Sequence, residues 1–151
     1  MLSRWYLIGL LLGGCRRATG AEPRALTGLF ELEHALTLCG ASRGPEPCDV
    51  QAPFRHYIVT FAPAGEVCKY AEYRLVPLTA FDSTFRAAVD TFAQRFGQSQ
   101  LIGNRFHQWP QAGFIAFASN QRADYNPPGP EDSLGAVITG YSLAGSENCP
   151  R

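Results

Sequence analysis

The clearest pattern of apolar and polar positions runs from Thr79 to Gly97. Its apolar side chains recur at steps of three and four residues, which places them on one stripe of a helix. These residues are Phe81, Phe85, Ala88, Val89, Phe92 and Phe96. Thr79 and Asp82 resemble a capping pair, and Gly97 is a natural stop after the last turn. The pattern predicts an amphipathic helix whose aromatic stripe packs against a sheet.

Around this helix the apolar positions alternate with a period of two, which is typical of half-buried strands. Before the helix, the strand-like segments are 29–38, 57–61 and 67–76, and a short helix is an alternative for the first of them. After it, they are 101–109, 113–119 and 136–143. Ala64 and Gly65 suit a hairpin turn between the second and third strands. The order βββ-α-βββ predicts one α+β domain, an antiparallel sheet with a single helix packed on one face.

The N-terminus has the anatomy of an export signal. Arg4 precedes an apolar run over 5–12, and small residues follow. The run is too short for a membrane-spanning helix, which needs roughly 20 apolar residues. We therefore expect a signal peptide over 1–21, a mature domain over 22–151, and a protein that is either secreted or held at the periplasmic face of a bacterial envelope.

Two cleavage sites compete in this leader. The sequence Leu-Gly-Gly-Cys at 12–15 resembles the lipobox of bacterial lipoproteins, which implies a signal over 1–14 and a lipid on Cys15. Alternatively, Ala-Thr-Gly at 18–20 suits an ordinary signal peptidase, although Arg16 and Arg17 lie where charge is usually avoided. A lipid on Cys15 is the only membrane attachment that the sequence suggests.

Cysteine parity agrees with export. Five cysteines are present, and either cleavage removes Cys15 from the pool of free thiols. The remaining four are Cys39, Cys48, Cys68 and Cys149. In an oxidising compartment they are expected to form two disulfides, with three connectivities open. We favour Cys39–Cys48, which closes a Gly- and Pro-rich loop, together with Cys68–Cys149, which ties down the C-terminus.

Removing the leader also changes the charge. The mature chain keeps ten basic and thirteen acidic residues, a formal net charge of −3. This balance argues against a nucleic-acid partner, because such binding depends on a basic surface.

The C-terminal half resembles a pattern found in many small exported bacterial envelope proteins of unknown function. The shared features are an amphipathic helix that ends in aromatic-Gly, a Trp strand, an apolar strand and a late Tyr, here Phe96-Gly97, Trp109, 114–118 and Tyr141. The chain departs from the pattern at Phe96, where the family has tyrosine, and at Ser99, where it has proline. The resemblance implies the strand order and an envelope setting, and it carries no active site.

Two long segments rich in Pro and Gly, 40–53 and 120–133, predict loops. The second presents Arg122, Asp124 and Tyr125, which we take as candidate binding residues because long loops often carry function. The alternative is that both segments are solvated connectors.

The sequence contains no recognisable catalytic, metal or cofactor motif. His34, His56 and His107 could serve as general acids or bases, but partly buried histidines in strands are more often structural. A zinc site built from His34, Cys39, Cys48 and His56 has the right ligand types, but its spacing fits no compact zinc knuckle. We therefore expect no metal, no cofactor and no catalytic residues.

These observations favour a non-enzymatic exported envelope protein with a binding or structural role. Its partner would be another envelope or extracellular protein or a cell-wall component, and an inhibitor-like role fits its size. The alternative is a small secreted hydrolase or nuclease that uses histidine acid–base chemistry.

Overall fold

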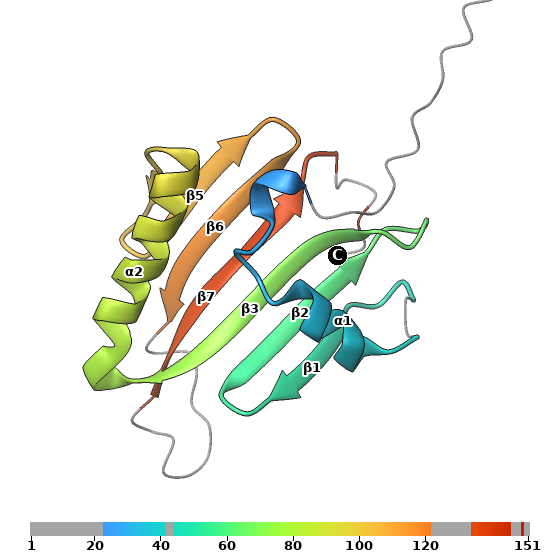
Figure 1. The fold of residues 1–151 in the computed structure, drawn as a ribbon, viewed down its shortest axis with the longest axis horizontal. Helices are drawn as coiled ribbons and strands as arrows, with labels where there is room; N and C mark the ends of the chain where they lie inside the picture. Colours follow the sequence, from blue (N-terminus) through green and yellow to red (C-terminus); the bar gives the residue numbers. More distant parts are fainter. Residues whose placement is uncertain (1–22, 42–43, 122–133, 146–148, 150–151) are drawn as a thin grey trace, which may run out of the picture.

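Seven strands form one antiparallel sheet in the order β1-β2-β3-β7-β6-β5-β4 (Figure 1). The structure is a computed structural model that describes residues 23–41, 44–121, 134–145 and 149. The strands are β1 (Cys48–Ala52), β2 (Arg55–Phe61), β3 (Val67–Pro77), β4 (Gln100–Ile102), β5 (Phe106–Gln111), β6 (Phe114–Gln121) and β7 (Leu134–Leu143). The helices are η1 (Arg24–Leu26), α1 (Leu32–Cys39) and α2 (Leu78–Phe96).

The sheet consists of two meanders joined by α2. β1, β2 and β3 pair in chain order, and α2 then carries the chain from the middle of the sheet to its far edge at β4. The strands β4 to β7 return step by step until β7 pairs with β3 along its length, from Lys69 opposite Ser142 to Pro77 opposite Leu134. The two central strands therefore come from distant parts of the sequence.

Both α-helices cover the same face of the sheet. α2 packs over β5, β6 and β7, and α1 lies over β1 and β2 (Figure 1). The Phe30 ring, on the segment that connects η1 to α1, fills the seam between them, with ring centroids 5.3 Å from Tyr70, 5.7 Å from Phe92 and 5.5 Å from Tyr141. One continuous core thus joins α1, α2 and the inward side of five strands.

The predicted long helix is confirmed, with a shift of one residue at each end. α2 spans Leu78–Phe96 and buries Phe81 and Phe92 against the sheet. The predicted capping pair is wrong, because Pro77 occupies the N-cap position and makes no side-chain cap. Proline is well suited to a helix start, where its missing N–H costs no hydrogen bond.

The prediction of a strand over 29–38 is wrong, and the alternative of a short helix is confirmed, because Leu32–Cys39 forms α1. Leu32, Ala35 and Cys39 are its buried positions, and their spacing of three and four residues is helical. The observed order is therefore α-βββ-α-ββββ, since β1 lies inside the predicted loop 40–53 and a turn at 103–105 divides the predicted strand 101–109. The α+β class and the antiparallel sheet stand, whereas the single-helix arrangement does not.

Two disulfides brace this fold, and they are the two pairs that the spacing favoured. Cys39–Cys48 joins the end of α1 to the start of β1, and Cys68–Cys149 ties the C-terminal segment to β3. The predicted hairpin turn also stands, with the Gly65 N–H donating to the Ala62 carbonyl at 2.8 Å.

The face of the sheet opposite the helices, here called the open face, carries no helix among the described residues. At its centre Gly140 lies beneath the Phe117 ring of the neighbouring strand. A Cβ on Gly140 would come 2.5 Å from Phe117 Cζ and would also collide with the Tyr70 carbonyl oxygen. Only glycine allows the aromatic ring to lie this close to the strand.

We predict that Gly140→Ala lowers the free energy of unfolding by about 1–3 kcal/mol, because the added methyl must displace a ring and a backbone oxygen. Gly44→Ala is the matched control, since a Cβ there meets nothing within 4 Å. Its effect should stay within about 0.5 kcal/mol. Urea denaturation of both variants measures the difference, and equal stabilities would contradict the close approach of Phe117 to Gly140.

Candidate functional site

A groove runs between α2 and the N-terminal segment on the helix-covered face of the sheet, with a cavity volume of about 440 Å³. We call it the helix-face groove. Its lining residues are Leu29, Arg74, Ser83, Thr84, Ala87, Ala88, Thr91, Phe92, Val137 and Thr139. The volume falls in the range of small-molecule sites.

The groove exists because one flank of α2 carries small side chains. Ser83, Ala87 and Thr91 recur at steps of four, so they form one exposed row along the helix. Alanine and hydroxyl side chains in this row leave space above Val137 and Thr139 of β7, which form part of the lining. The aromatic stripe of α2 lies on a different side of the helix and holds it against the sheet.

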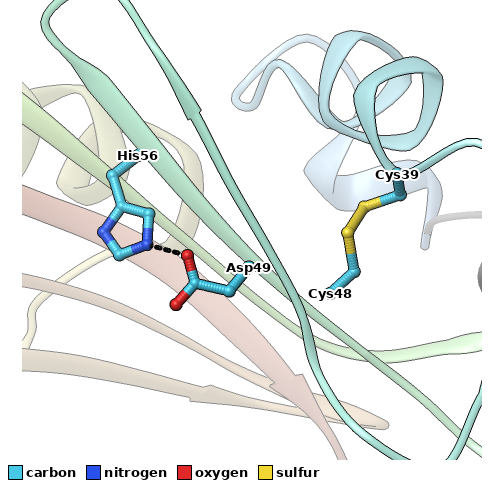
Figure 2. Close-up of a disulfide and its surroundings, with 4 residues drawn as sticks. All are labelled: Cys39, Cys48, Asp49 and His56. Carbon is cyan, nitrogen blue, oxygen red and sulfur yellow. Dashed lines mark hydrogen bonds and ion pairs between the residues drawn. A yellow bond between two sulfur atoms is a disulfide. The ribbon is translucent and has the colours of Figure 1, made fainter.

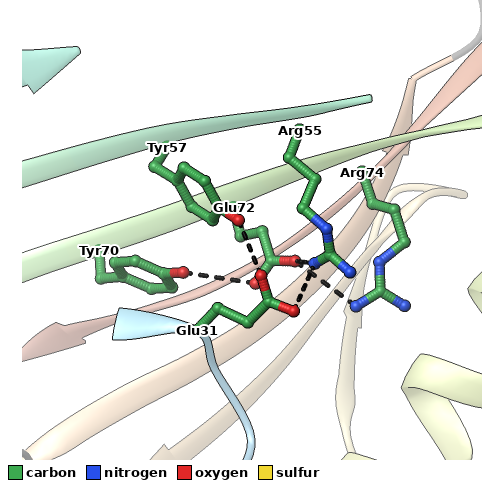
Figure 3. A network of polar contacts seen from close by, with 6 residues as sticks. All are labelled: Glu31, Arg55, Tyr57, Tyr70, Glu72 and Arg74. Carbon is green, nitrogen blue, oxygen red and sulfur yellow. Dashed lines mark hydrogen bonds and ion pairs between the residues drawn. The ribbon is translucent and has the colours of Figure 1, made fainter. Parts of the chain in front are cut away.

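Arg74 of the groove lining belongs to a network of charged and tyrosine side chains (Figure 3). Glu72 on β3 is opposite Thr139 in the register, and its side chain is only 3% exposed. Arg55 donates to Glu72 Oε1, Arg74 Nη2 lies 3.4 Å from the same oxygen, and Tyr70 Oη donates to Oε2 at 3.3 Å. A buried carboxylate is tolerated only when donors surround it in this way.

The same network ties the N-terminal segment to the sheet. Arg55 Nη1 also lies 3.1 Å from Glu31 Oε1, and Tyr57 Oη donates to Glu31 Oε2 at 2.8 Å (Figure 3). Because Glu31 immediately precedes α1, these two contacts help to set the position of that helix. Arg55 therefore bridges a buried and an exposed carboxylate.

The two tyrosines of the network act as proton donors. Burial, followed by the hydrogen bond to Glu31, raises the pKa of Tyr57 to about 12. Burial and the negative charge of Glu72 raise the pKa of Tyr70 still further. Both phenols consequently stay neutral under physiological conditions and keep donating to their carboxylates.

Arg74 is the member of the network that can reach a ligand. Its side chain is 49% exposed and lines the helix-face groove, and its one described ion pair is the long contact to Glu72. A guanidinium carries five N–H donors in a planar fork, so this contact leaves donors for a second carboxylate. The contact with Glu72 restricts the positions that the guanidinium can take at the groove.

The three histidines lie in separate neighbourhoods. The His34 ring on α1 is 5.8 Å from that of Tyr57, and His56 Nε2 on the open face lies 2.6 Å from Asp49 Oδ1 (Figure 2). His107 Nδ1 lies 2.7 Å from Ser99 Oγ, and its ring contacts those of Phe85 and Trp109. No histidine lines the helix-face groove.

The zinc site considered from the sequence cannot form, because two of its four ligands are bonded to each other. Cys39 and Cys48 form a disulfide, whereas zinc requires free thiolates (Figure 2). Among the described residues, no group of three or more His, Cys, Asp or Glu side chains is arranged to hold a metal ion.

The other predicted site residues fall outside the described part of the chain. These are Cys15 and the loop residues Arg122, Asp124 and Tyr125. Conversely, the sequence reasoning overlooked Glu72, Arg55 and Arg74. A signal was available, since Tyr70, Glu72 and Arg74 alternate along one strand and therefore share one face with the core.

No family model matches the chain, and neither a curated protein nor a solved structure matches it significantly. Within the described residues, no helix is both long and apolar enough to span a membrane. The function must therefore be argued from the sites themselves.

We predict that Glu72→Gln lowers the free energy of unfolding by about 3 kcal/mol, because it leaves the positive charge of Arg55 without its buried partner. Glu33→Gln, on the exposed side of α1, is the matched control and should cost less than about 1 kcal/mol. Urea denaturation compares the two variants. A Glu72→Gln protein as stable as the control would mean that the buried carboxylate contributes no net stability.

An alkaline titration tests the tyrosine assignments. The folded-state pKa of Tyr57 exceeds that of an unfolded tyrosine, so its contribution to stability is complete below about pH 10 and is lost as the pH rises through about 12. We expect lower urea stability at about pH 11 than at about pH 9, and a smaller loss in Tyr57→Phe. Tyrosinate absorbance should show a component that ionises only at unusually high pH, and Tyr57→Phe and Tyr70→Phe should each reduce it. Ionisation of all six tyrosines at the pH of an ordinary tyrosine would refute the assignment.

Proposed function

We propose that this chain is a non-enzymatic exported binding protein whose helix-face groove binds a small hydroxylated carboxylate. The observation that carries the proposal is the half-exposed guanidinium of Arg74 on the groove wall, supported from below by buried Glu72. Because Glu72 already holds the Arg74 side chain, less side-chain conformational entropy is lost when a ligand binds.

The lining of the groove defines the class of ligand. Arg74 offers a planar fork suited to a carboxylate. The Ser83 and Thr91 hydroxyls donate to backbone carbonyls of α2, so they remain free to accept hydrogen bonds from ligand hydroxyls. Leu29, Ala87 and Ala88 at the same groove offer an accessible apolar surface for the face of a sugar ring. Sugar acids combine these features, and a cell-wall component is one source of them.

Export is supported by the two disulfides, which are compatible with an oxidising compartment. The leader and its alternative cleavage sites extend the proposal to a periplasmic lipoprotein anchored through Cys15 or to a secreted protein. The resemblance to small exported envelope proteins points to the same setting. A partner protein of the envelope or the extracellular space remains part of the proposal, with the Arg122, Asp124 and Tyr125 loop as its contact.

A binding role is favoured over catalysis at this groove by the chemistry of its lining. Catalysis by a serine or threonine hydroxyl requires a neighbouring base to activate it. Within the part of the chain that the structure describes, neither histidine nor a carboxylate lines the helix-face groove. Its hydroxyls can therefore bind a ligand but lack an evident group to deprotonate them.

The runner-up is a hydrolase that uses the pair of Ser99 and His107. Their contact of 2.7 Å is within the range of an activated nucleophile and its base. Among the described contacts of His107, the remaining partners are the aromatic rings of Phe85 and Trp109, and no carboxylate orients the imidazole. This arrangement supports a hydrolase less well than it supports a packed histidine.

The groove proposal predicts that glucuronate and gluconate bind the mature protein, with affinity measured by calorimetry and thermal shift. Arg74→Met should weaken binding about tenfold or more, because it removes the charge-assisted hydrogen bonds. Arg86→Met is the matched control, since Arg86 is exposed on α2 and does not line the groove. Its affinity should equal that of the unmodified protein. Equal weakening by both variants would indicate nonspecific attraction and overturn the proposal, as would the absence of any binding.

The runner-up predicts hydrolysis of an activated ester such as p-nitrophenyl acetate above the rate of free imidazole. If Ser99 and His107 act together, Ser99→Ala and His107→Gln should each reduce turnover by ~10² or more. Asp49→Asn, which alters the separate His56 pair, serves as the control and should leave turnover unchanged. We expect no turnover in any of these proteins, and turnover that depends on Ser99 would replace the binding proposal.

A further inference from the structure

The centre of the open face contains a trough whose shape follows from the register of four strands. Ile58, Ala71, Gly140 and Phe117 lie in one row across β2, β3, β7 and β6. The two middle positions carry only a methyl group and a hydrogen, while large side chains stand at both ends. Since adjacent strands are about 4.8 Å apart, the backbones at the two ends of the row are roughly 14 Å apart. The Phe117 ring covers Gly140, so Ala71 forms the open floor between Ile58 and that ring. The resulting cavity of about 190 Å³ is here called the open-face trough.

One wall of the trough is held in place by packing. The Phe117 ring lies against Gly140, and it stacks on the Phe106 ring with centroids 5.6 Å apart and planes at 17°. A wall fixed in this way does not need to be ordered when a ligand enters. The trough is therefore a preformed apolar surface.

Among the described residues that line the trough, one carries a positive charge. Lys69 is the only lysine in the chain, and it lies between Thr60 and Ser142 in the adjacent row across β2, β3 and β7. All three residues line the open-face trough. Lys69 is partly buried, and among the described residues no carboxylate lies within ion-pair distance of its ammonium group.

We propose that the open-face trough binds a small carboxylate that carries a compact apolar group, with its carboxylate on Lys69 and its apolar group between Ile58 and Phe117. The ammonium group supplies the charge that attracts an acid, and the carbon lining supplies the surface that selects an apolar body. A volume of 190 Å³ equals that of roughly six water molecules at about 30 Å³ each, which fits a phenyl ring or a short acyl chain. This site lies on the face opposite the helix-face groove, so it does not rest on the function proposed there.

The chain offers an unusually specific probe of this site. Because Lys69 is the only lysine, isotope labelling of lysine places a single reporter side chain at the rim of the trough. Titration of the labelled protein with hexanoate or benzoate should shift this one signal in a saturable manner. The two probes distinguish an acyl chain from an aromatic ring as the apolar group that fits better.

A truncated acid, acetate, and an uncharged analogue, hexanol, separate the contributions of the charge and the apolar group to hexanoate binding. Acetate keeps the carboxylate and should bind at least tenfold more weakly than hexanoate, because it lacks four buried methylene groups. Hexanol keeps the chain without the charge and should also bind more weakly. If acetate shifts the Lys69 signal at the same concentration as hexanoate, Lys69 binds anions without a trough and the proposal is wrong.

Variants complete the test. Lys69→Met should weaken hexanoate binding about tenfold, measured by calorimetry, while hexanol binding changes less than twofold. Ala71→Leu fills the floor and should abolish the binding of both compounds. Arg86→Met, which is exposed on α2 and lines neither site, is the matched control and should bind hexanoate as the unmodified protein does. Hexanoate binding unchanged in Lys69→Met would overturn the role of the charge.

A measurement on the unmodified protein covers the case in which Ala71→Leu does not fold. Bound hexanoate should show intermolecular nuclear Overhauser effects between its methylene protons and both Ile58 and the Phe117 ring. Saturable binding without these contacts would place the ligand elsewhere and refute the proposal. Loss of glucuronate binding at the groove would leave this result unaffected, so the failures of the two proposals are distinguishable.

Discussion

The buried carboxylate of Glu72 is the constraint on which much of the arrangement depends. A charge in this position requires donors, and the chain provides them from β2 and β3 through Arg55, Arg74 and Tyr70. Arg55 also pairs with Glu31 and thereby fixes the N-terminus of α1. The need of Glu72 for donors thereby links the middle of the sheet, the N-terminal segment and the wall of the helix-face groove. It also holds the Arg74 guanidinium beside that groove.

Aromatic packing fills the space around this charge. The rings of Tyr57, Tyr70 and Tyr141 follow one another across β2, β3 and β7 on the helix-covered face, and Phe30 lies against the last two. The disulfide Cys39–Cys48 closes the outer end of the same layer. The helix-covered face thus combines a hydrophobic seam with a charged floor, whereas the open face relies on strand pairing and on the close contact of Phe117 with Gly140.

Much of the fold could be predicted because it depends on local periodicity. The apolar stripe of α2 has a single face on a helix, and the hairpin at Gly65 follows from turn chemistry. The segment 29–38 misled because short apolar runs fit both periods, and its helical character depends on the burial of Leu32, Ala35 and Cys39 beneath the helix, which packs on β1 and β2. The candidate site was missed because Glu72, Arg55 and Arg74 match no motif, and only their convergence gives them a role.

The sequence alone therefore determined the α+β class, the long amphipathic helix and the expectation of two disulfides, because each follows from local periodicity or from the count of cysteines. The tertiary structure decided which strands are central, which charge is buried and where the groove and the trough lie. β3 and β7 are about sixty residues apart in the chain, and no local propensity specifies that they pair. Their pairing places Glu72 beside Thr139 and Ala71 beside Gly140, and both candidate sites depend on that long-range register.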